Sequence, residues 1–491
     1  MQVLNANAAS SALYHTPLYF TDVIRGTTEA DSMELFSDKP GDEGLPGGKR
    51  ALAMAAVMTS TTMAVFDGSM VNIALPQIAR ALGVSADAAV WVSNGYLLSA
   101  AMTLAIFAAL ASRMGFRLLF ALGLSIFTLA SLGCALSSSL NTLTAWRVAQ
   151  GIGGAATLSI APAILRTVFP NRLLGRILGL NALLIAASTA VAPLLGGTLL
   201  STLSWPWLFA INIPLGLLAL ALTLRVVPAN KTPARAPFDL AGAGLSALML
   251  GATVMAASRF MSEPGYALVA AIAGAAFVWR QRRAPQPLMP LAMFASVRFS
   301  LAALTSLASF ISQGMTFIAL PFLFQSVYGY SAFVSALLFT PWPLGIMLAA
   351  PYAGRLADRH SPALISTIGL CLFAFGLALL ALLPDPAQIG DIAARSLVCG
   401  LGFGCFQSPN NREMLANASR ENSGYASGVL AIMRTFGQCL GTAFVGVILS
   451  IFAQTADQQA LAVRLSLWIA VSATVLALVI SAIRIRKSRV C

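Results

Sequence analysis

The residue with the clearest capacity for chemistry is a single carboxylate, Asp67, inside the first strongly apolar segment of the chain. An ionised aspartate near the centre of a bilayer costs about 2.5–3.5 kcal/mol on insertion scales. A chain retains such a group where it faces a cavity, pairs with a cation, or binds and releases a proton. The alternative is a structural polar residue that is hydrogen-bonded to a neighbouring helix. We interpret Asp67 as functional, because ionisable residues inside membrane segments usually have functional roles.

A second costly residue, Arg147, lies in the fourth apolar segment. Asp67 precedes Pro76 by nine residues, and Arg147 follows Asn141 by six. At about 1.5 Å per residue, both side chains are expected roughly 9–14 Å below the same surface. A guanidinium at that depth is a natural partner for the carboxylate, and hydrogen bonding within the helix bundle is its alternative role. The depths therefore predict an Asp67–Arg147 pair.

The composition is typical of a protein that crosses a membrane many times. Of the 491 residues, 58% are hydrophobic and 10% are charged, whereas soluble domains have about 25% charged residues. The net charge of +13 would suggest nucleic-acid binding in a soluble protein, but here we attribute it to membrane topology and predict no nucleic-acid partner. Only two histidines are present, and the six cysteines show no metal-ligand spacing. We therefore predict no metal and no cofactor.

Fourteen segments are apolar enough to cross a membrane, which takes about 20 residues per helix. They are residues 51–76, 91–111, 117–138, 142–166, 176–200, 205–227, 239–259, 264–280, 299–325, 333–354, 362–383, 391–411, 424–452 and 461–483. With the N-terminus in the cytoplasm, the great majority of the 30 basic residues fall in cytoplasmic tails and loops. This asymmetry follows the positive-inside rule. It predicts that both termini are cytoplasmic.

Several motifs then resemble one known family, in order along residues 51–484. Residues 67–76 read Asp-Gly-Ser-Met-Val-Asn-Ile-Ala-Leu-Pro and resemble the first-helix signature of the fourteen-span drug:proton antiporters of the major facilitator superfamily. Residues 147–151, Arg-Val-Ala-Gln-Gly, are similar to the family's Arg-x-x-x-Gly motif. On the fifth helix, the family's antiporter motif is matched by Gly179, Ser188, Ala192, Pro193, Gly196 and Gly197, with Ser188 and Ala192 replacing two glycines. The resemblance implies that this helix shapes the cavity, and small-residue packing is the alternative.

The loop after the second span resembles the family's Gly-x-Leu-Ala-Asp-Arg-x-Gly motif. It retains Arg113 and Gly115, but Ser112 stands where the family has aspartate. The equivalent loop of the second half keeps Gly354, Asp358 and Arg359, as an internal repeat predicts. The resemblance therefore implies an altered charge-relay latch at Ser112. Asp358 is either a surviving latch or a solvated loop charge.

The resemblance implies an all-α polytopic membrane protein with the major facilitator fold. We expect a disordered cytoplasmic tail (1–50), a six-helix bundle (51–227), a linker with a two-helix insertion (228–298), a second six-helix bundle (299–484) and a basic cytoplasmic tail (485–491). Substrate would bind between the bundles near the midplane. Candidate cavity residues are aromatic or polar: Trp91, Asn94, Tyr96, Phe310, Gln313, Phe317, Gln325, Trp342 and Arg434. For each of them, ordinary packing or placement at the membrane interface is the alternative.

The sequence favours an ion gradient over ATP as the energy source. The segment most similar to a phosphate loop, residues 43–50, has Glu43 in place of the first glycine and Arg50 in place of Ser/Thr. We predict a monomeric inner-membrane exporter of lipophilic drugs or other xenobiotics, in which a proton neutralises Asp67 and weakens its hold on Arg147. One titrating carboxylate suggests about one proton per cycle, which favours a lipophilic monocation or a neutral molecule. An exporter of one small metabolite is an alternative, and a membrane enzyme or sensor is a remote one, because two histidines leave little for acid–base chemistry.

Overall fold

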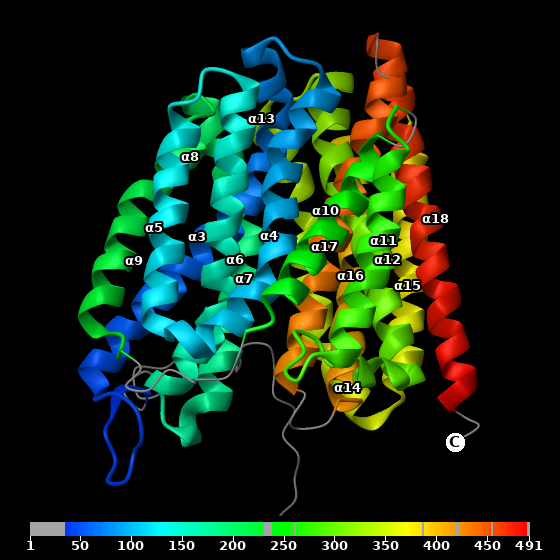
Figure 1. Ribbon diagram of the computed structural model, residues 1–491. Coiled ribbons are helices and arrows are strands. Elements are labelled where there is room, and N and C mark those ends of the chain that lie inside the picture. Colours follow the sequence, from blue (N-terminus) through cyan, green and yellow to red (C-terminus); the bar gives the residue numbers. More distant parts are fainter. Residues whose placement is uncertain are drawn as a thin grey trace, which may run out of the picture.

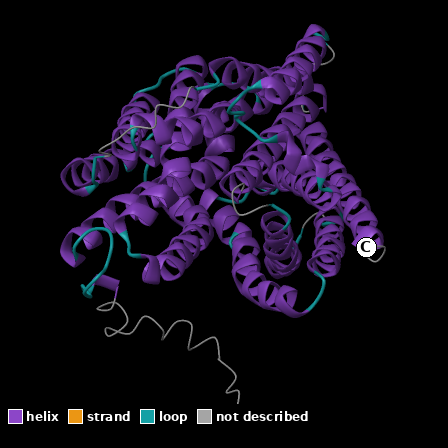
Figure 2. Cartoon of the chain, turned by 60° about the horizontal axis from the view of Figure 1, so that its bottom comes forward, coloured by secondary structure: helices purple, strands orange, loops and turns teal. Residues whose placement is uncertain are grey.

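The computed structural model describes residues 35–229, 238–259, 262–384, 387–418, 423–452 and 455–488. Every regular element in these ranges is a helix (Figure 2). A bilayer offers no water to backbone N–H and C=O groups, so each spanning segment must satisfy its own hydrogen bonds, and a helix does so. The long helices run side by side from one end of the molecule to the other (Figure 1). The chain is therefore an all-α, multi-pass membrane protein.

The N-terminal half is built from seven α-helices and one 3₁₀ turn. They are α3 (Gly47–Leu82), α4 (Ala86–Met114), α5 (Phe116–Ala135), α6 (Leu140–Val168), η1 (Asn171–Leu173), α7 (Leu174–Thr202), α8 (Trp207–Ala210) and α9 (Asn212–Val226). Helix α6 packs against α4 and α5, and α3 packs against α7 and α9. Helix α3 continues through Pro76, where the sequence suggested an end, because membrane helices tolerate proline. It stops at Gly83, whose φ of 63° suits glycine.

The C-terminal half follows a two-helix insertion. The insertion consists of α10 (Leu240–Arg259) and α11 (Gly265–Arg283). The half itself contains η2 (Leu291–Ala295), α12 (Val297–Phe322), the π-helical η3 (Leu323–Val327), α13 (Ala332–Phe339), α14 (Pro341–Arg359), α15 (Pro362–Ala381), α16 (Ile389–Ala416), α17 (Ser423–Phe452) and α18 (Ala456–Ser488). Helix α16 packs against α14 and α15, and α12 packs against α17 and α18. Helix α10 contacts both α4 and α17, so the insertion lies beside the junction of the halves.

The fourteen predicted spans correspond to helical segments, but they are not equally apolar. Thirteen helical segments of the described ranges are long and apolar enough to cross a membrane. The remaining one is α11, which carries Arg280, Arg282 and Arg283 in its last turn. Its apolar part, 266–279, covers about 21 Å, which is less than the ~30 Å hydrocarbon core of a bilayer. The short eighth span predicted from the sequence is therefore a helix whose apolar part is cut short by the arginines of its last turn.

The segment before the first span differs in part from the predicted disordered tail. Residues 1–34 lie outside the described residues, but 35–50 are packed against the helix bundle. Arg50 is buried and pairs with Asp38 at 3.2 Å, and Arg172 pairs with Asp42 at 2.7 Å. The hydrogen-bonded Arg172 guanidinium holds the pKa of Asp42 well below its usual value. Charge pairing across 35–50 and the loop after α6 therefore orders this part of the chain.

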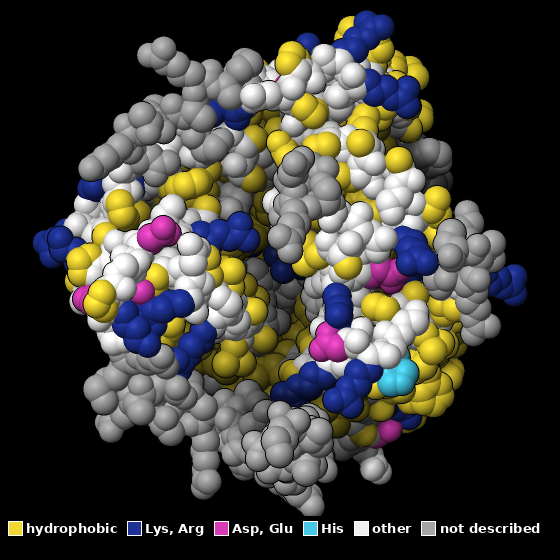
Figure 3. Space-filling model, turned by 90° about the horizontal axis from the view of Figure 1, so that it is seen from below, with side chains coloured by type: hydrophobic (Ala, Val, Ile, Leu, Met, Phe, Trp, Pro, Cys, Tyr) yellow, Lys and Arg dark blue, Asp and Glu magenta, His cyan; other side chains and the backbone are white. Residues whose placement is uncertain are grey.

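The two ends of the helix bundle differ in charge. Arginines occupy the last turns of five helices that finish at the same end: Arg113, Arg166, Arg225, Arg280 and Arg359. Figure 3 looks onto this end, where basic side chains surround a hollow between the two halves. We call it the arginine-rich end and the other the opposite end. The distribution agrees with the asymmetry that the sequence predicts for the loops.

Candidate functional site

Asp67 lies in the interior of the N-terminal half, where it forms an ion pair with Arg147. Asp67 is on α3 and Arg147 is on α6, and both side chains are almost completely buried. The structure thus brings together the two residues that the sequence analysis placed at the same depth. Two charges withdrawn from water are tolerated only with close pairing and further hydrogen bonds. The surroundings of Asp67 supply those bonds.

Amide side chains complete the hydrogen bonding of the Asp67 carboxylate. Nε2 of Gln150 donates to Oδ1 at 2.8 Å, and Nδ2 of Asn212 on α9 donates to the same oxygen at 3.2 Å. Gln150 lies one turn after Arg147 on α6, and its Oε1 accepts from the guanidinium at 2.6 Å. Nε2 of Gln150 also lies 2.9 Å from Oγ of Ser131 on α5. One buried polar network therefore joins α3, α5, α6 and α9.

Arg147 also contacts α4, through a carbonyl group and an aromatic ring. Its Nε donates to the carbonyl of Val92 at 2.9 Å. Its guanidinium carbon lies 4.4 Å from the ring centroid of Tyr96 and 5.6 Å from that of Phe209, within the range of cation–π attraction. A Cβ at Gly154 would lie 2.7 Å from the Tyr96 hydroxyl oxygen. The absence of a side chain at Gly154 therefore makes room for Tyr96 beside the ion pair.

A cavity of about 390 Å³ lies between the two halves. Gly68 and Tyr96 belong to its wall. Gly68 directly follows Asp67 in the chain, and Tyr96 packs against Arg147. The cavity and the buried ion pair therefore share a wall, and Tyr96 contacts both.

The cavity is continued by a second hollow toward the arginine-rich end. The second hollow measures about 410 Å³, and Arg113, Phe238 and Tyr425 belong to its lining. The two spaces follow the same helix, since Leu104 of α4 lines the first and Ala105 lines the second. The space-filling view shows the surface hollowed between the halves at this end (Figure 3). The central cavity therefore faces the arginine-rich end.

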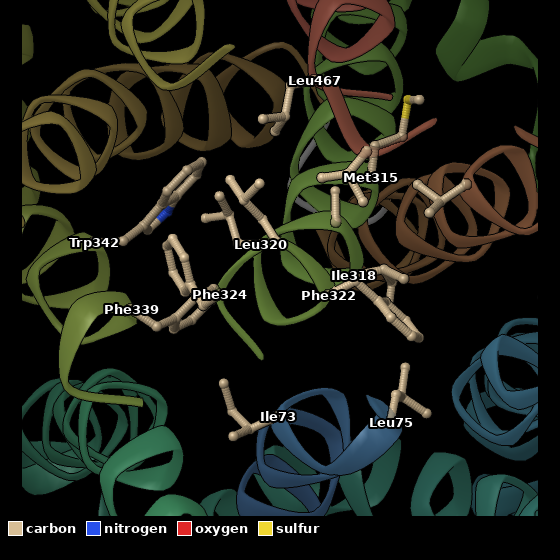
Figure 4. Packing of buried hydrophobic residues seen from close by; sticks show 14 of the residues in the cluster. Ile73, Leu75, Met315, Ile318, Leu320, Phe322, Phe324, Phe339, Trp342 and Leu467 are labelled. Atoms are coloured by element: carbon tan, nitrogen blue, oxygen red, sulfur yellow. The ribbon is translucent and has the colours of Figure 1, made fainter. Parts of the chain in front are cut away.

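The halves are in contact at the opposite end, and Figure 4 shows side chains of both halves in this packing. Nε2 of Gln325 in η3 donates to the carbonyl oxygen of Ile73 on α3 at 2.7 Å. Ile73, Leu75, Ile318, Phe322 and Trp342 belong to one buried apolar cluster that spans this contact. With the hollow on the other side, the structure is closed at the opposite end and open toward the arginine-rich end.

The predicted cavity residues separate into two groups. Five line the central cavity: Tyr96, Phe310, Gln313, Phe317 and Arg434. The other four, Trp91, Asn94, Gln325 and Trp342, do not belong to its lining. Gln325 closes the opposite end, Trp342 is buried in an aromatic cluster with Phe317 and Phe373, and Asn94 accepts a bond of 2.9 Å from Sγ of Cys439. Polar and aromatic residue types alone do not distinguish cavity walls from contacts between helices.

The fifth-helix motif lies on α7, and its glycines have different surroundings. A Cβ at Gly197 would lie 2.5 Å from Cβ of Ala336 and 2.9 Å from the carbonyl oxygen of Ala332 on α13. A Cβ at Gly196 would meet the side chain of Met70 on α3 at 3.0 Å, whereas one at Gly179 would meet no atom within 4 Å. Ser188, Ala192 and Pro193 are buried within α7. Gly197 is therefore the motif position that allows the two halves to touch.

The predicted gating loops lie at the arginine-rich end. Arg113 donates to the carbonyl of Ala109 at 2.6 Å and to Oε1 of Gln286 at 3.3 Å, and Gly115 separates α4 from α5 with a φ of 90°. The side chain of Ser112 lies outside the described set. In the second half, Asp358 pairs with Arg412 on α16, and both are exposed. Arg359 is exposed, and a Cβ at Gly354 would meet Oγ of Ser408 at 3.0 Å. The Asp358 pair therefore joins two helices of the same half.

A second buried ion pair escaped the sequence analysis. Glu413 on α16 and Arg484 on α18 lie 3.4 Å apart, and both are buried. Nη1 of Arg484 donates to Oδ1 of Asn410 at 2.6 Å, and Asn410 in turn donates to Ser306 of α12 at 2.8 Å. Arg484 directly follows the last predicted span, 461–483, so the positive-inside rule predicts a cytoplasmic location for it. A sequence signal for this inward direction of Arg484 is the polar Ser481, one turn earlier on the same helix. Oγ of Ser481 accepts from Nη2 of Arg484 at 3.1 Å.

Asp239 anchors the two-helix insertion at the arginine-rich end. It accepts from the backbone N–H of Gly242 at 3.0 Å, from Nε of Arg280 at 2.8 Å and from Nε2 of Gln281 at 2.9 Å. Burial acts to raise the pKa of Asp239, but these hydrogen bonds outweigh it and hold the pKa below its usual value. The start of α10 is thereby fixed to the end of α11.

Comparisons with known proteins agree on one family. The sequence model of the Major Facilitator Superfamily matches residues 57–442. The uncharacterized transporter YebQ of Escherichia coli (strain K12) is 40% identical over 455 residues, which cover 91% of this chain and 98% of YebQ. The riboflavin transporter RibZ of Clostridioides difficile (strain 630) is 28% identical, covering 89% and 98%. The multidrug resistance protein Stp of Mycobacterium tuberculosis (strain CDC 1551 / Oshkosh) is 31% identical, covering 81% and 76%.

Proposed function

The chain belongs to the major facilitator superfamily, and on this premise we propose that it is a proton-coupled exporter of small lipophilic molecules. We assign it to the fourteen-span drug:proton antiporter type and place it in the inner membrane, with the arginine-rich end and both termini in the cytoplasm. The positive-inside rule supports this orientation. Substrate would enter the central cavity from the cytoplasm in the conformation described here. It would leave after the arginine-rich end closes and the opposite end opens.

The observation that carries the proposal is the wall shared by the Asp67–Arg147 pair and the cavity. A proton that binds Asp67 removes the negative charge that holds Arg147 in place. Arg147 then interacts less strongly with α3, while it still contacts Tyr96 on α4. Because Tyr96 also lines the cavity, occupancy of the cavity and protonation of Asp67 act on the same side chain. This arrangement provides a physical link between proton and substrate.

The names of two relatives support different ranges of substrate. Stp is described as a multidrug resistance protein, which supports a broad range for the present chain. RibZ is described as a riboflavin transporter, which supports the second candidate, an exporter of one metabolite. A cavity of about 390 Å³ with Phe310 and Phe317 in its wall suits small aromatic molecules in either case. Drug-susceptibility profiling of an expressing strain separates the two candidates, because only a multidrug exporter protects against unrelated compounds.

The deciding experiment is transport in proteoliposomes with an imposed pH gradient. The probe is the compound against which the expressing strain gains most resistance. Asp67→Asn is expected to abolish its accumulation against a gradient while retaining exchange of labelled for unlabelled compound. Asp87→Asn is the matched control, since Asp87 lies in the first turn of α4, outside the polar network. If Asp67→Asn accumulates the compound at the wild-type rate, Asp67 is not the coupling residue.

A further inference from the structure

The wall of the central cavity carries an uncompensated positive charge. Arg434, on α17, is the only charged residue among the described residues that line it. Within the described chain, no carboxylate forms an ion pair with Arg434. Asp67 directly precedes the lining residue Gly68, but it is already paired with Arg147. Arginine remains protonated under all ordinary conditions. The cavity therefore has a fixed charge that no described side chain neutralises.

Such a charge is unusual in this setting. A cation withdrawn from bulk water is destabilising unless a counter-charge or hydrogen bonds compensate it. Arg147 and Arg484, two buried arginines, each face a carboxylate. Arg434 instead faces a space large enough for a ligand. An occupant with a negative charge would supply the missing partner.

One amide near Arg434 has its nitrogen left as a donor. Arg434, Gln438 and Thr442 are spaced four residues apart on α17, so they follow one face of the helix, and all three line the cavity. Nε2 of Gln438 donates to Oε1 of Gln313 at 2.9 Å. This bond engages the oxygen of Gln313 and leaves its amide nitrogen as a donor, while Gln438 keeps its amide oxygen as an acceptor.

The N-terminal half contributes a donor in the same way. Asn72 on α3 lines the cavity, and its Oδ1 accepts from Oγ of Ser93 at 2.7 Å. Its amide nitrogen is therefore the group left for an occupant. Because the amide oxygens of Asn72 and Gln313 are both engaged by protein donors, each half presents an N–H group. Donors that accompany a guanidinium match the lone pairs of an oxyanion.

We propose that the cavity takes molecules with an aromatic or otherwise apolar body and one ionised acidic group, such as a carboxylate, which Arg434 binds. This assignment names the substrate class of the exporter and rests on the proposed function. The apolar body would lie against Phe310 and Phe317, and the amide of Gln313, which is hydrogen-bonded to Gln438 one turn after Arg434, would donate to the acidic group. The proposal replaces the sequence-based expectation of a monocation or neutral molecule, because a monocation would meet a like charge in the cavity.

The test uses three compounds that share one ring system and differ in charge: 1-naphthylacetic acid, 1-naphthylacetamide and 1-naphthylethylamine. Their binding to the purified full-length protein in detergent is measured at pH 7 by ligand-induced thermal stabilisation and by equilibrium binding. The acid is expected to bind about 10- to 100-fold more tightly than the amide, as a charge-assisted hydrogen bond allows. The amine is expected to bind most weakly. Equal binding of the three compounds, or binding of none, overturns the proposal.

Two variants link the preference to the residue. Arg434→Gln is expected to lose the 10- to 100-fold preference for the acid while binding of the amide stays within a few-fold. Arg434→Lys keeps the charge and is expected to retain most of the preference, which also shows that the site tolerates substitution. If Arg434→Gln keeps the preference, Arg434 is an arginine solvated by cavity water and the proposal is wrong. Binding requires no gradient, so a preference without proton-driven accumulation would refute the proposed function and leave this inference intact.

Discussion

Replacing Gly197 with alanine is expected to disfavour the conformation described here, in which the opposite end is closed. The added Cβ would lie 2.5 Å from Cβ of Ala336 and 2.9 Å from the carbonyl oxygen of Ala332. Carbon atoms in contact are normally about 3.5–4.0 Å apart. Both obstructing atoms belong to the backbone of α13 or are attached directly to it, so no rotation of a side chain can relieve the overlap. Helices α7 and α13 must instead move apart, which opens the contact between the halves.

The size of the effect follows from the cost of overpacking. Inserting one methyl group into a tightly packed contact typically costs about 1–3 kcal/mol. The open state lacks this contact and does not bear the cost, so the full amount enters the equilibrium between the two states. A difference of 1–3 kcal/mol corresponds to a population ratio changed by about 5- to 150-fold. Gly197→Ala should therefore shift the protein measurably toward opening at the opposite end.

Spin-label distance measurements can follow this shift in lipid nanodiscs. Labels at Ser138 and Gln388, both exposed and in loops of different halves, report the separation at the opposite end. Gly179→Ala is the matched control, because it makes the same substitution on the same helix where a Cβ meets no atom within 4 Å. The long-distance population is expected to grow in Gly197→Ala alone. Indistinguishable distributions for the two variants would refute the packing argument.

Three further predictions concern the buried and paired charges. Tyr96→Leu removes the ring beside Arg147 and should lower transport more than Tyr96→Phe, which keeps the cation–π contact. Initial transport rates of the two variants in proteoliposomes test this difference. Arg484→Gln leaves Glu413 as an unpaired buried charge and should destabilise the protein by about 3–5 kcal/mol. Adding Glu413→Gln should restore much of this loss of stability, and unfolding in detergent measures both variants. The hydrogen bonds of Asp239 lower its pKa in the folded state, so their contribution to stability is complete at pH 7 and is lost as the pH falls below about 4. The difference in unfolding temperature between wild type and Asp239→Asn should therefore shrink on acidification, and a constant difference would contradict this assignment.

The sequence predicted the arrangement of helices well because membrane helices are recognisable by length and apolarity. Residue depth was equally informative, since counting from span ends placed Asp67 beside Arg147. The same approach failed for Arg484, which lies near a span end but turns inward to Glu413. Position along a helix fixes depth, whereas the direction in which a side chain points depends on how that helix is rotated against its neighbours.

The cavity wall shows the same limit. Gln313 and Gln325 have the same side chain and lie on one continuous helical segment, yet one lines the cavity and the other closes the opposite end. Gln325 itself lies in the π-helical turn at 323–327, and nothing in the residue types announces that turn. Gln150 was likewise visible within the Arg147 motif, but its role as a bridge between Asp67, Arg147 and Ser131 requires three helices to be in place.

The lone charge of Arg434 has an electrical consequence for the transport cycle. If one proton enters for each cargo molecule that leaves, a monocation makes the exchange electroneutral, a neutral cargo moves one positive charge inward, and a monoanion moves two. A membrane potential that is negative on the arginine-rich side then contributes nothing to the export of a monocation. It contributes about 2.3 kcal/mol per 100 mV to the export of a neutral cargo, and about twice that amount to the export of a monoanion. An arginine that selects anionic cargo would therefore allow the voltage to drive export even when the pH difference across the membrane is small.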